Sequence, residues 1–110
     1  MKPKVYIASP YSQGDQVLNV QRAIDVAEEI KRRGYIPFIP HLSMLWHLYK
    51  PHTIGFWYDY DLEWIPCCDY LIRLAGDSVG ADHEVEVAEG MGIKVIHSAS
   101  ELPIRRDCNS

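Results

Sequence analysis

The stretch "KVYIASPYSQGDQVLNVQRAIDVAEEIKRRGYIPFIP" spans residues 4–40 and decides the fold. Val5 to Ala8 form a short β-rich run that predicts a buried strand, and "YIPFIP", residues 35–40, predicts a second strand. Between the two, apolar residues recur at the spacing of one helix face. They are Val20, Ala23, Ile24, Ala27 and Ile30. A strand, a helix and a strand in under 40 residues form a βαβ unit, whose strands run parallel.

The ends of this helix are marked by particular residue types. Asn19 is typical of an N-cap or a first-turn residue. Gly34 follows three basic residues and is typical of the glycine just beyond a helix C-terminus. The sequence therefore predicts a helix between Asn19 and Gly34.

The rest of the chain continues the alternation of helix and strand. Met44, Leu45 and Leu48 predict a short helix, which Pro51 and Gly55 end. The further predicted elements are a helix over 57–68, a strand over 69–76, a helix over 81–92 that Gly90 or Gly92 closes, a strand over 93–98 and a short helix or tail over 101–110. The helix over 57–68 would place Trp57, Asp61, Trp64 and Ile65 on one face, although Pro66 is unfavourable inside a helix.

This order of elements predicts an α/β fold, with an open, mostly parallel sheet of the flavodoxin or Rossmann type flanked by helices. A length of 110 residues predicts a single domain, residues 1–110. Such sheets bind ligands beyond the carboxyl ends of their strands. That rule gathers three loops at one place: "SPYSQG" (9–14), "PHLS" (40–43) and "GDSVGADHE" (76–84).

Composition excludes several classes of protein. A net charge of −4 argues against non-specific binding to nucleic acid, which needs clustered Lys and Arg. No apolar run approaches the ~18 residues of a membrane span, and "MKPKVYIASPYS" lacks the apolar length of a signal peptide. Three cysteines form no disulfide framework and no zinc-site spacing. We therefore expect a cytoplasmic protein that uses no metal or cofactor. The chain has no Walker A or G-x-G-x-x-G motif, so the sequence indicates no dinucleotide site.

The segment "GDSVGADHEVEVA", residues 76–88, combines a glycine-containing loop with an acidic helix start. Backbone amides at a helix N-terminus suit a phosphate or another anion, and Ser78 adds a hydroxyl. Glu84 is then a candidate working carboxylate at the mouth of a site. The alternative is that Gly76 and Gly80 simply make a tight turn and that the acidic residues favour the positive end of the helix dipole.

Other polar and aromatic side chains come from the same three loops or from residues near them. Tyr6, Ser9, Tyr11 and Ser12 offer stacking and hydroxyl groups. Tyr6 is equally typical of a core aromatic, and His41 is more typical of a capped or partly buried histidine than of a catalytic one. An acid on an apolar helix face, as Asp61 is, is uncommon unless it is paired or functional. Asp61 and Glu84 are thus two carboxylates that the fold brings toward one site, as glycosyl-bond chemistry requires.

Four motifs give the chain a family resemblance over residues 4–97: "VYIASPYS", "GYIPFIPHLS", "DLEWIPCCDYLIRL" and "SVGADHEVEVA". With these motifs it resembles the nucleoside 2-deoxyribosyltransferase superfamily. Within that superfamily it is most similar to the nucleoside 5′-monophosphate N-glycosidases, the branch of the 2′-deoxynucleoside 5′-phosphate N-hydrolases and CMP hydrolases. The last motif is the most specific.

The resemblance implies a role for each matching residue. Glu84 matches the carboxylate nucleophile, which we expect its helix N-terminus to keep ionised, Asp61 matches the second acid, and Tyr6 matches a tyrosine of the first strand. Ser78 stands where the monophosphate hydrolases carry a serine against the phosphate and the transferases an aspartate. The predicted substrate-binding residues are Ser9, Tyr11, Ser12, His41, Ser78 and Gly80.

The chain also departs from the family pattern. The deoxynucleotide hydrolases carry a phosphate-binding arginine in the first loop, and "SPYSQG" has none. Arg22 and Arg73 are the two candidates to replace it. The transferases complete each site with an asparagine-containing segment of a neighbouring subunit, and no segment of "HSASELPIRRDCNS" matches it.

The predicted function is therefore cleavage of the N-glycosidic bond of a (deoxy)nucleoside 5′-monophosphate, which yields a free base and a sugar phosphate. Two alternatives stay open: a nucleoside 2-deoxyribosyltransferase, in which a second base replaces water, and a non-catalytic nucleotide-binding domain. We further expect a homodimer or higher homo-oligomer, because residues 44–64 hold more aromatic and apolar side chains than a core of this size needs.

Overall fold

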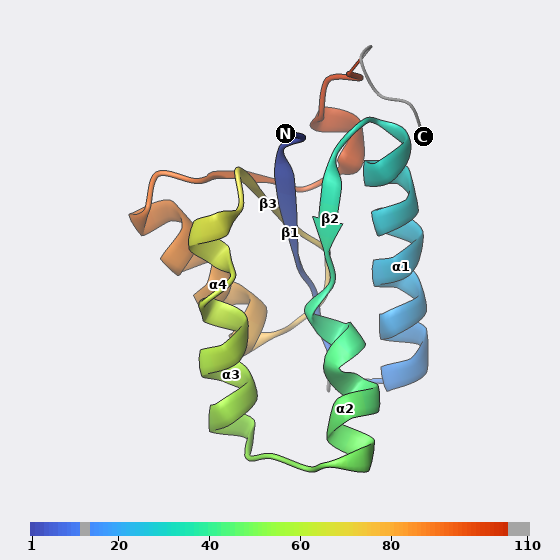
Figure 1. Ribbon diagram of the computed structural model, residues 1–110, viewed down its shortest axis with the longest axis vertical. Coiled ribbons are helices and arrows are strands. Elements are labelled where there is room, and N and C mark those ends of the chain that lie inside the picture. Colours follow the sequence, from blue (N-terminus) through green and yellow to red (C-terminus); the bar gives the residue numbers. More distant parts are fainter. Residues whose placement is uncertain (12–13, 106–110) are drawn as a thin grey trace.

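The computed structural model describes residues 1–11 and 14–105. Four parallel strands form one sheet in the order β2-β1-β3-β4, which confirms the predicted α/β fold (Figure 1). The strands are β1 (Lys4–Ala8), β2 (Ile36–Phe38), β3 (Tyr70–Arg73) and β4 (Lys94–Ile96). The α-helices are α1 (Gln16–Arg32), α2 (Met44–Tyr49), α3 (Ile54–Leu62) and α4 (Val79–Gly90). None of the helices in the described ranges is long and apolar enough to cross a membrane.

Helices cover both faces of the sheet (Figure 1). Val5 and Ile7 of β1 pack on the α1 side, with Ala23 and Ile30 of that helix. Tyr6 and the other alternate residues of β1 face the opposite side, where α4 and the 3-10 turn after α3 pack. This alternation follows from the two-residue period of a strand. The helix that follows β1 covers one face of the sheet, and the helix that follows β3 covers the other. A crevice therefore forms between β1 and β3, beyond the carboxyl ends of these strands.

Helix α1 differs at its start from the sequence prediction. Its N-cap is Asp15, whose Oδ1 accepts hydrogen bonds from the amides of Val17 (2.9 Å) and Leu18 (3.2 Å). A side-chain oxygen at this position satisfies amides that have no partner inside the helix, so the helix begins before Asn19. Gly34 has a φ of 100° directly after the helix, as predicted. Ile24 of the predicted apolar stripe is 37 % exposed, because it lies at the margin of the buried face.

The helix predicted over residues 57–68 is wrong at both ends. It begins at Ile54, and Gly55, which was predicted to end the preceding run, lies inside it. Helix α3 stops at Leu62, and residues Ile65–Cys67 form a separate 3-10 turn that begins beside Pro66. Proline has no amide hydrogen and clashes with the preceding turn of an α-helix, so the helix cannot run through it. Trp57 and Asp61 therefore share helix α3, whereas Trp64 and Ile65 lie beyond it.

Helices α2 and α3 extend past the carboxyl ends of the strands as a helical hairpin (Figure 1). Thr53 caps α3 by accepting a hydrogen bond from the Phe56 amide (3.0 Å). The Trp57 indole Nε1–H donates to Nδ1 of His47 (2.7 Å) and joins the two helices. Trp46 packs edge-on against Trp57, with ring centroids 5.0 Å apart. This hairpin holds Asp61 over the end of the sheet.

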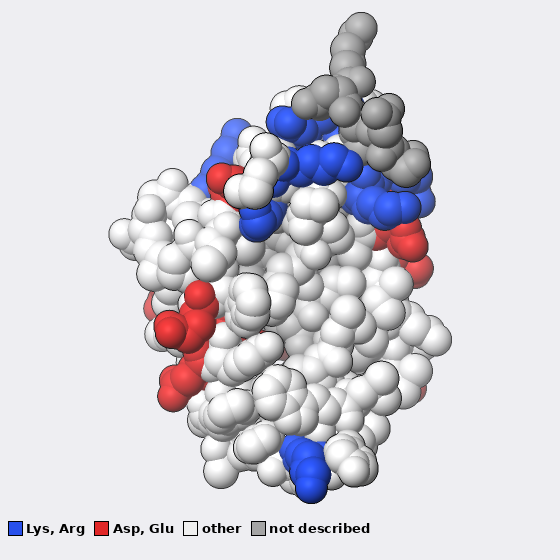
Figure 2. All heavy atoms as spheres, viewed as in Figure 1, with Lys and Arg blue, Asp and Glu red and all other residues white. Residues whose placement is uncertain are grey.

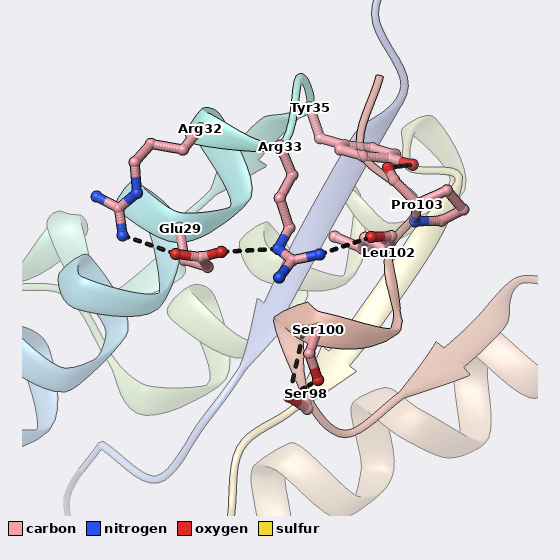
Figure 3. A network of polar contacts seen from close by, with 8 residues as sticks. All are labelled: Glu29, Arg32, Arg33, Tyr35, Ser98, Ser100, Leu102 and Pro103. Atoms are coloured by element: carbon pink, nitrogen blue, oxygen red, sulfur yellow. Dashed lines mark hydrogen bonds and ion pairs between the residues drawn. The ribbon is translucent and has the colours of Figure 1, made fainter. Parts of the chain in front are cut away.

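The opposite, amino end of the sheet is closed by the segment after β4 (Figure 3). Arg33 Nη1 donates to the Leu102 carbonyl (3.0 Å), and the Tyr35 hydroxyl donates to the Pro103 carbonyl (2.8 Å). Glu29 accepts hydrogen bonds from both Arg32 and Arg33. Of the short helix or tail predicted over 101–110, only Glu101 lies in a 3-10 turn, Ala99–Glu101, and residues 102–105 follow as a segment tied to the end of α1. Residues 106–110 of this prediction lie outside the described residues.

Candidate active site

Pro10 is the point at which the three predicted loops meet. The His41 Nε2–H, in the segment after β2, donates to the Pro10 carbonyl (2.9 Å). In the loop after β3, a Cβ on Gly76 would lie 2.8 Å from Pro10 Cγ, and the φ of this glycine is 122°. Only glycine fits such a close approach and such a backbone. The carboxyl ends of the strands thus gather residues of all three loops, as the sequence predicts.

A cluster of Tyr6, Asp61 and Glu84, here named the acid cluster, lies on the α4 face of the sheet. The Tyr6 hydroxyl of β1 donates a hydrogen bond to Oε2 of Glu84 of α4. Tyr6 is fully buried, so it is both a core aromatic and a partner of the candidate nucleophile. Asp61 arrives from α3 and is partly buried. Its Oδ1 is buried and accepts no hydrogen bond from the described part of the chain.

Burial dominates the electrostatics of both carboxyl groups. It raises the pKa of Glu84 to about 7, against the hydrogen bond from Tyr6 and the charge of Arg73, which lower it. Burial raises the pKa of Asp61 to about 7 as well, and the charge of Glu84 adds to this rise. The pKa of the Tyr6 hydroxyl is also raised, by burial and by Glu84. Two interacting carboxyls of this kind titrate as a pair, and each disfavours ionisation of the other.

The expectation that the helix N-terminus keeps Glu84 ionised is corrected by this geometry. Helix α4 begins at Val79, with Ser78 as its N-cap, so Asp82 lies in the first turn and Glu84 lies beyond it. The effect of the helix dipole falls off within the first turn. Desolvation of the buried carboxylate therefore outweighs it, and the pKa of Glu84 rises.

The predicted substrate-binding residues fall into different environments. Tyr11 lies partly buried, with its ring edge-on to His41 and the centroids 5.0 Å apart. His41 is buried, and burial lowers the pKa of its imidazole. Ser9 is also buried, and its hydroxyl points to the neighbouring Pro10 carbonyl at 3.4 Å. Ser12 lies outside the described residues.

At the start of α4, Ser78 accepts a hydrogen bond from the Ala81 amide (3.0 Å), so capping is one established task of this hydroxyl. Gly80 lies in the first turn, where a Cβ would come within 3.7 Å of the Tyr58 ring of α3. The tight-turn alternative therefore holds for Gly76 but not for Gly80, which lies inside α4.

Both candidate arginines bind the loop after β3. Arg22 of α1 donates to the Ala75 carbonyl. Arg73 donates to the carbonyls of Leu74 and Gly76 and pairs with Asp82 at 3.0 Å. In the sequence, Arg73 is the single charged residue of an otherwise apolar strand. A charge in such a place needs a partner, which indicates a contact at the strand end.

Sequence reasoning missed an aromatic wall beside the acid cluster. Phe38 of β2 lies against Tyr6, with centroids 5.4 Å apart, and Trp64 stacks on Phe38 at 5.1 Å. A cavity of about 350 Å³ opens next to this wall. It is lined by Pro37, Phe38, Ile39, Pro40, Leu42, Ser43, Trp46 and Tyr60. The two carboxyl groups are not among its lining residues, so the cavity adjoins the acid cluster through Phe38.

Charge is distributed unevenly around the site. Figure 2 shows Lys and Arg gathered at the amino end of the sheet, whereas the centre of this face is uncharged. Within residues 1–11 and 14–105, no group of three or more His, Cys, Asp or Glu side chains is arranged to hold a metal ion. The chemistry available from the described side chains is that of two carboxyls, a phenol and surrounding aromatic rings.

Two solved structures share this fold. One is a 2-deoxyribosyltransferase from Bacillus psychrosaccharolyticus, with a TM-score of 0.61 and 24% sequence identity, covering 84% of this chain and 69% of that one. The other is a 2-desoxiribosyltransferase from Leishmania mexicana, with a TM-score of 0.66 and 18% identity, covering 86% of this chain and 63% of that one. This chain therefore spans about two thirds of the length of either protein.

Among curated proteins, no sequence matches this chain. The family that does match is described as "Domain of unknown function (DUF7768)", and the match runs over residues 3–98. That range includes all four strands, all four α-helices and the acid cluster. The chain belongs to the DUF7768 family.

Proposed function

We propose that this protein cleaves the N-glycosidic bond of a (deoxy)nucleoside 5′-monophosphate, as a member of the nucleoside 2-deoxyribosyltransferase superfamily. The observation that carries the proposal is the acid cluster: Glu84 accepts a hydrogen bond from Tyr6, and a second buried carboxyl, Asp61, shares its electrostatic environment. Glycosyl-bond cleavage by carboxylates uses one group as nucleophile and the other as acid. The likeness of the fold to two deoxyribosyltransferases supports the same chemistry.

The hydrogen bonds support one assignment of the two roles. Tyr6 donates to Glu84 and Arg73 is close enough to lower its pKa, so Glu84 is the group that holds the negative charge. Asp61 has a buried oxygen with no donor from the described residues, so it is the group that holds the proton. Groups with matched pKa values near neutral pH exchange protons efficiently with a substrate. Tyr6 also fixes the direction of the Glu84 carboxylate.

The first step forms a covalent glycosyl ester. An Oε of Glu84 bonds to C1′ of the sugar while the bond from C1′ to the base nitrogen breaks. The electron pair of that bond leaves with the base, which takes the proton from Asp61. In the second step a water oxygen attacks C1′ and the water gives a proton to Asp61. The C1′–Oε bond breaks, Glu84 regains its charge and the sugar phosphate is free.

The loop after β3 is the proposed place of the phosphate. Amides at the start of α4 and the two arginines that bind this loop are groups that attract an anion. Ser78 carries no charge that would repel a phosphate, in contrast to an aspartate at the same place. The sugar would then lie along Tyr6, with Tyr11 or His41 at its border.

A screen for base release tests the proposal. The common nucleoside 5′-monophosphates and free nucleosides, in ribose and deoxyribose forms, are incubated with the protein and analysed by HPLC. We expect base release from at least one monophosphate and its loss in Glu84→Gln. Tight binding of a nucleotide without release of any base would instead identify a non-catalytic nucleotide-binding domain.

A second candidate function is nucleoside 2-deoxyribosyl transfer, which the two solved transferases with this fold favour. The same glycosyl ester would then be attacked by a nitrogen of a second base in place of water. Adding a different free base to the assay separates the two. Transfer produces a new nucleoside, whereas hydrolysis leaves only sugar phosphate and the first base.

We also propose that the protein forms a homodimer through the helical hairpin. Four large apolar side chains of this hairpin are strongly exposed, and together they are named the hairpin surface: Leu45 (73%), Leu48 (70%), Tyr49 (81%) and Ile54 (86%). Exposed apolar patches of this kind are typical of interfaces. A self-complementary patch favours a two-fold dimer.

A further inference from the structure

Arg73 occupies a strand position from which a side chain faces the acid cluster. It pairs in register with Ala8 of β1, and Leu71, two residues earlier, pairs with Tyr6. Leu71, Tyr6 and Ala8 all pack on the α4 face of the sheet. Because alternate residues of a strand share a face, Arg73 projects to that face too, one pleat beyond Tyr6 and toward α4.

Three contacts fix the direction of the Arg73 guanidinium. It donates to the carbonyls of Leu74 and Gly76, the latter at 2.9 Å, and to Oδ1 of Asp82 at 3.0 Å. The side chain of Arg73 is only 12% exposed, whereas that of Asp82 is 70% exposed. The planar guanidinium fork suits such a fixed arrangement, because its donors keep a constant geometry. A largely buried cation is therefore held against helix α4, the helix that carries Glu84.

We propose that Arg73 is a positioning residue that controls the charge of Glu84, and that Asp82 holds Arg73 in place for this task. The catalytic meaning of this control rests on the proposed function, because there Glu84 must be ionised to attack C1′. The electrostatic control itself is a property of the folded protein and exists without a substrate.

Every charged or titratable group around Glu84 bears on the inference. They are Tyr6 from β1, Tyr58 and Asp61 from α3, Arg73 from β3, and Asp82, His83 and Glu86 from α4 itself. Most of these groups are acids or phenols, which do not favour a negative charge on Glu84. The charge of Arg73 and the hydrogen bond from Tyr6 both act against the burial of Glu84 and lower its pKa. A cation in a partly desolvated site acts more strongly than one in water.

Carboxyl ¹³C NMR of protein labelled at glutamate Cδ tests the inference without any substrate. The pH midpoint of Glu84 is measured in the wild type and in Arg73→Met, which keeps an unbranched apolar side chain but no charge. We expect the Glu84 midpoint to rise by about half a pH unit or more, since an opposite charge nearby favours ionisation. The matched control is Arg22→Met. Arg22 binds the same loop through Ala75, and its removal leaves the Glu84 midpoint unchanged.

Two further variants separate charge from structure. Arg73→Lys keeps the charge and loses the fork, so its Glu84 midpoint lies near that of the wild type. Asp82→Asn removes a negative charge that neutralises Arg73, so its midpoint falls below the wild-type value. These two carry the test by themselves if Arg73→Met does not fold. Equal midpoints in wild type and Arg73→Met, an equal rise in Arg73→Lys and Arg73→Met, or no fall in Asp82→Asn would each overturn the inference.

The activity of the same variants gives an independent second reading. If base release is found, the acidic limb of its pH profile moves upward in Arg73→Met by the same amount as the Glu84 midpoint. If no base release is found in the wild type, the NMR midpoints still decide the role of Arg73. Failure of the proposed function and failure of this inference are therefore distinguishable.

Discussion

Glu29 and Glu84 are held in opposite ways at the two ends of the sheet. At the amino end, Glu29 of α1 accepts a hydrogen bond of 2.7 Å from Arg32 and another of 2.7 Å from Arg33 (Figure 3). At the carboxyl end, Glu84 of α4 accepts one from the phenol of Tyr6. The pKa of Glu29 is lowered by its two arginine partners, whereas burial raises the pKa of Glu84 to about 7.

This contrast distinguishes a structural carboxylate from a candidate catalytic one. Glu29 is solvated and paired with opposite charge, so its ionised form costs little and helps tie the C-terminal segment through Arg33. Glu84 and Asp61 lose hydration on burial. Within the described residues, neither of them forms a direct ion pair with a cation. Carboxyls with strongly raised pKa values in the crevice of a parallel sheet identify a candidate functional site.

Glu84→Gln is expected to have the largest effect, because it removes the charge and keeps the shape of the side chain. Base release falls by at least about 10²- to 10³-fold through lost transition-state stabilisation. Nucleotide binding stays within about tenfold, or ~1.4 kcal/mol. Steady-state kinetics and calorimetry measure the two quantities.

The matched control for Glu84→Gln is Glu86→Gln, on the same helix. The side chain of Glu86 is 77% exposed, and it points away from the acid cluster two residues further along α4. We expect near wild-type turnover in this variant. Full activity in Glu84→Gln together with loss of activity in Glu86→Gln would show that Glu84 is not the nucleophile.

The next largest effect is expected for the hairpin surface. Leu48→Asp places an unpaired charge in the proposed interface, which costs several kcal/mol when the site is buried in a dimer. We expect sedimentation velocity to show a dimer for the wild type and a monomer for Leu48→Asp at micromolar concentration. Val17→Asp on α1, also an exposed apolar position, serves as the control. A wild-type monomer at this concentration would reject the interface.

The two ends of the sheet also differ in how they respond to pH. A carboxyl whose folded pKa is raised binds protons more tightly in the folded state, so it makes the protein less stable as the pH rises from about 4 to about 7. Asp61 and Glu84 are of this kind, and together they are expected to lower the free energy of unfolding by about 1–3 kcal/mol over that window. Glu29 acts in the opposite direction, because its pKa is lowered and its contribution is lost as the pH falls.

Urea unfolding at pH 5 and pH 8 checks this difference. The double variant Asp61→Asn/Glu84→Gln lacks both titrations, so its stability at pH 8 gains relative to the wild type. Similar pH dependence in the two proteins would mean that the acid cluster is better solvated than the structure indicates.

Ser78→Asp is expected to have an effect of about tenfold. Aspartate is as good an N-cap as serine, so helix α4 keeps its start. The added charge repels a phosphate, and the preference for a 5′-monophosphate over the matching nucleoside falls by about one order of magnitude, ~1.4 kcal/mol. Calorimetric titration with both ligands measures the preference, and equal wild-type affinities would remove the phosphate argument. Ser78→Ala, which loses the cap and adds no charge, is the control for stability.

The smallest effect is expected for Glu29→Gln. Exposed ion pairs contribute little to stability because water screens them and because long side chains lose freedom. The urea midpoint should move only slightly and base release should not change. A large loss of activity in this variant would contradict the separation between the two ends of the molecule.

Much of the architecture could be predicted from local sequence patterns. The β-rich run in "KVYIASPYS", the helical stripe after it and Gly34 depend on neighbours along the chain, so the βαβ unit and the parallel sheet follow from them. The boundaries of α1 and α3 could not be assigned in the same way. Asp15 caps α1 before the predicted start, and Pro66 prevents the helix that was expected to include Trp64 and Ile65.

For the candidate site, the sequence by itself determined which residues follow the strands, because the order of strands and helices along the chain is read from local patterns. Only the tertiary structure decided their chemistry. The bond from Tyr6 to Glu84, the buried oxygen of Asp61 and the pair of Arg73 with Asp82 join positions that are far apart along the chain or on different elements. The pKa of a carboxyl depends on its desolvation and on charges around it in space, and neither is written in the residues next to it.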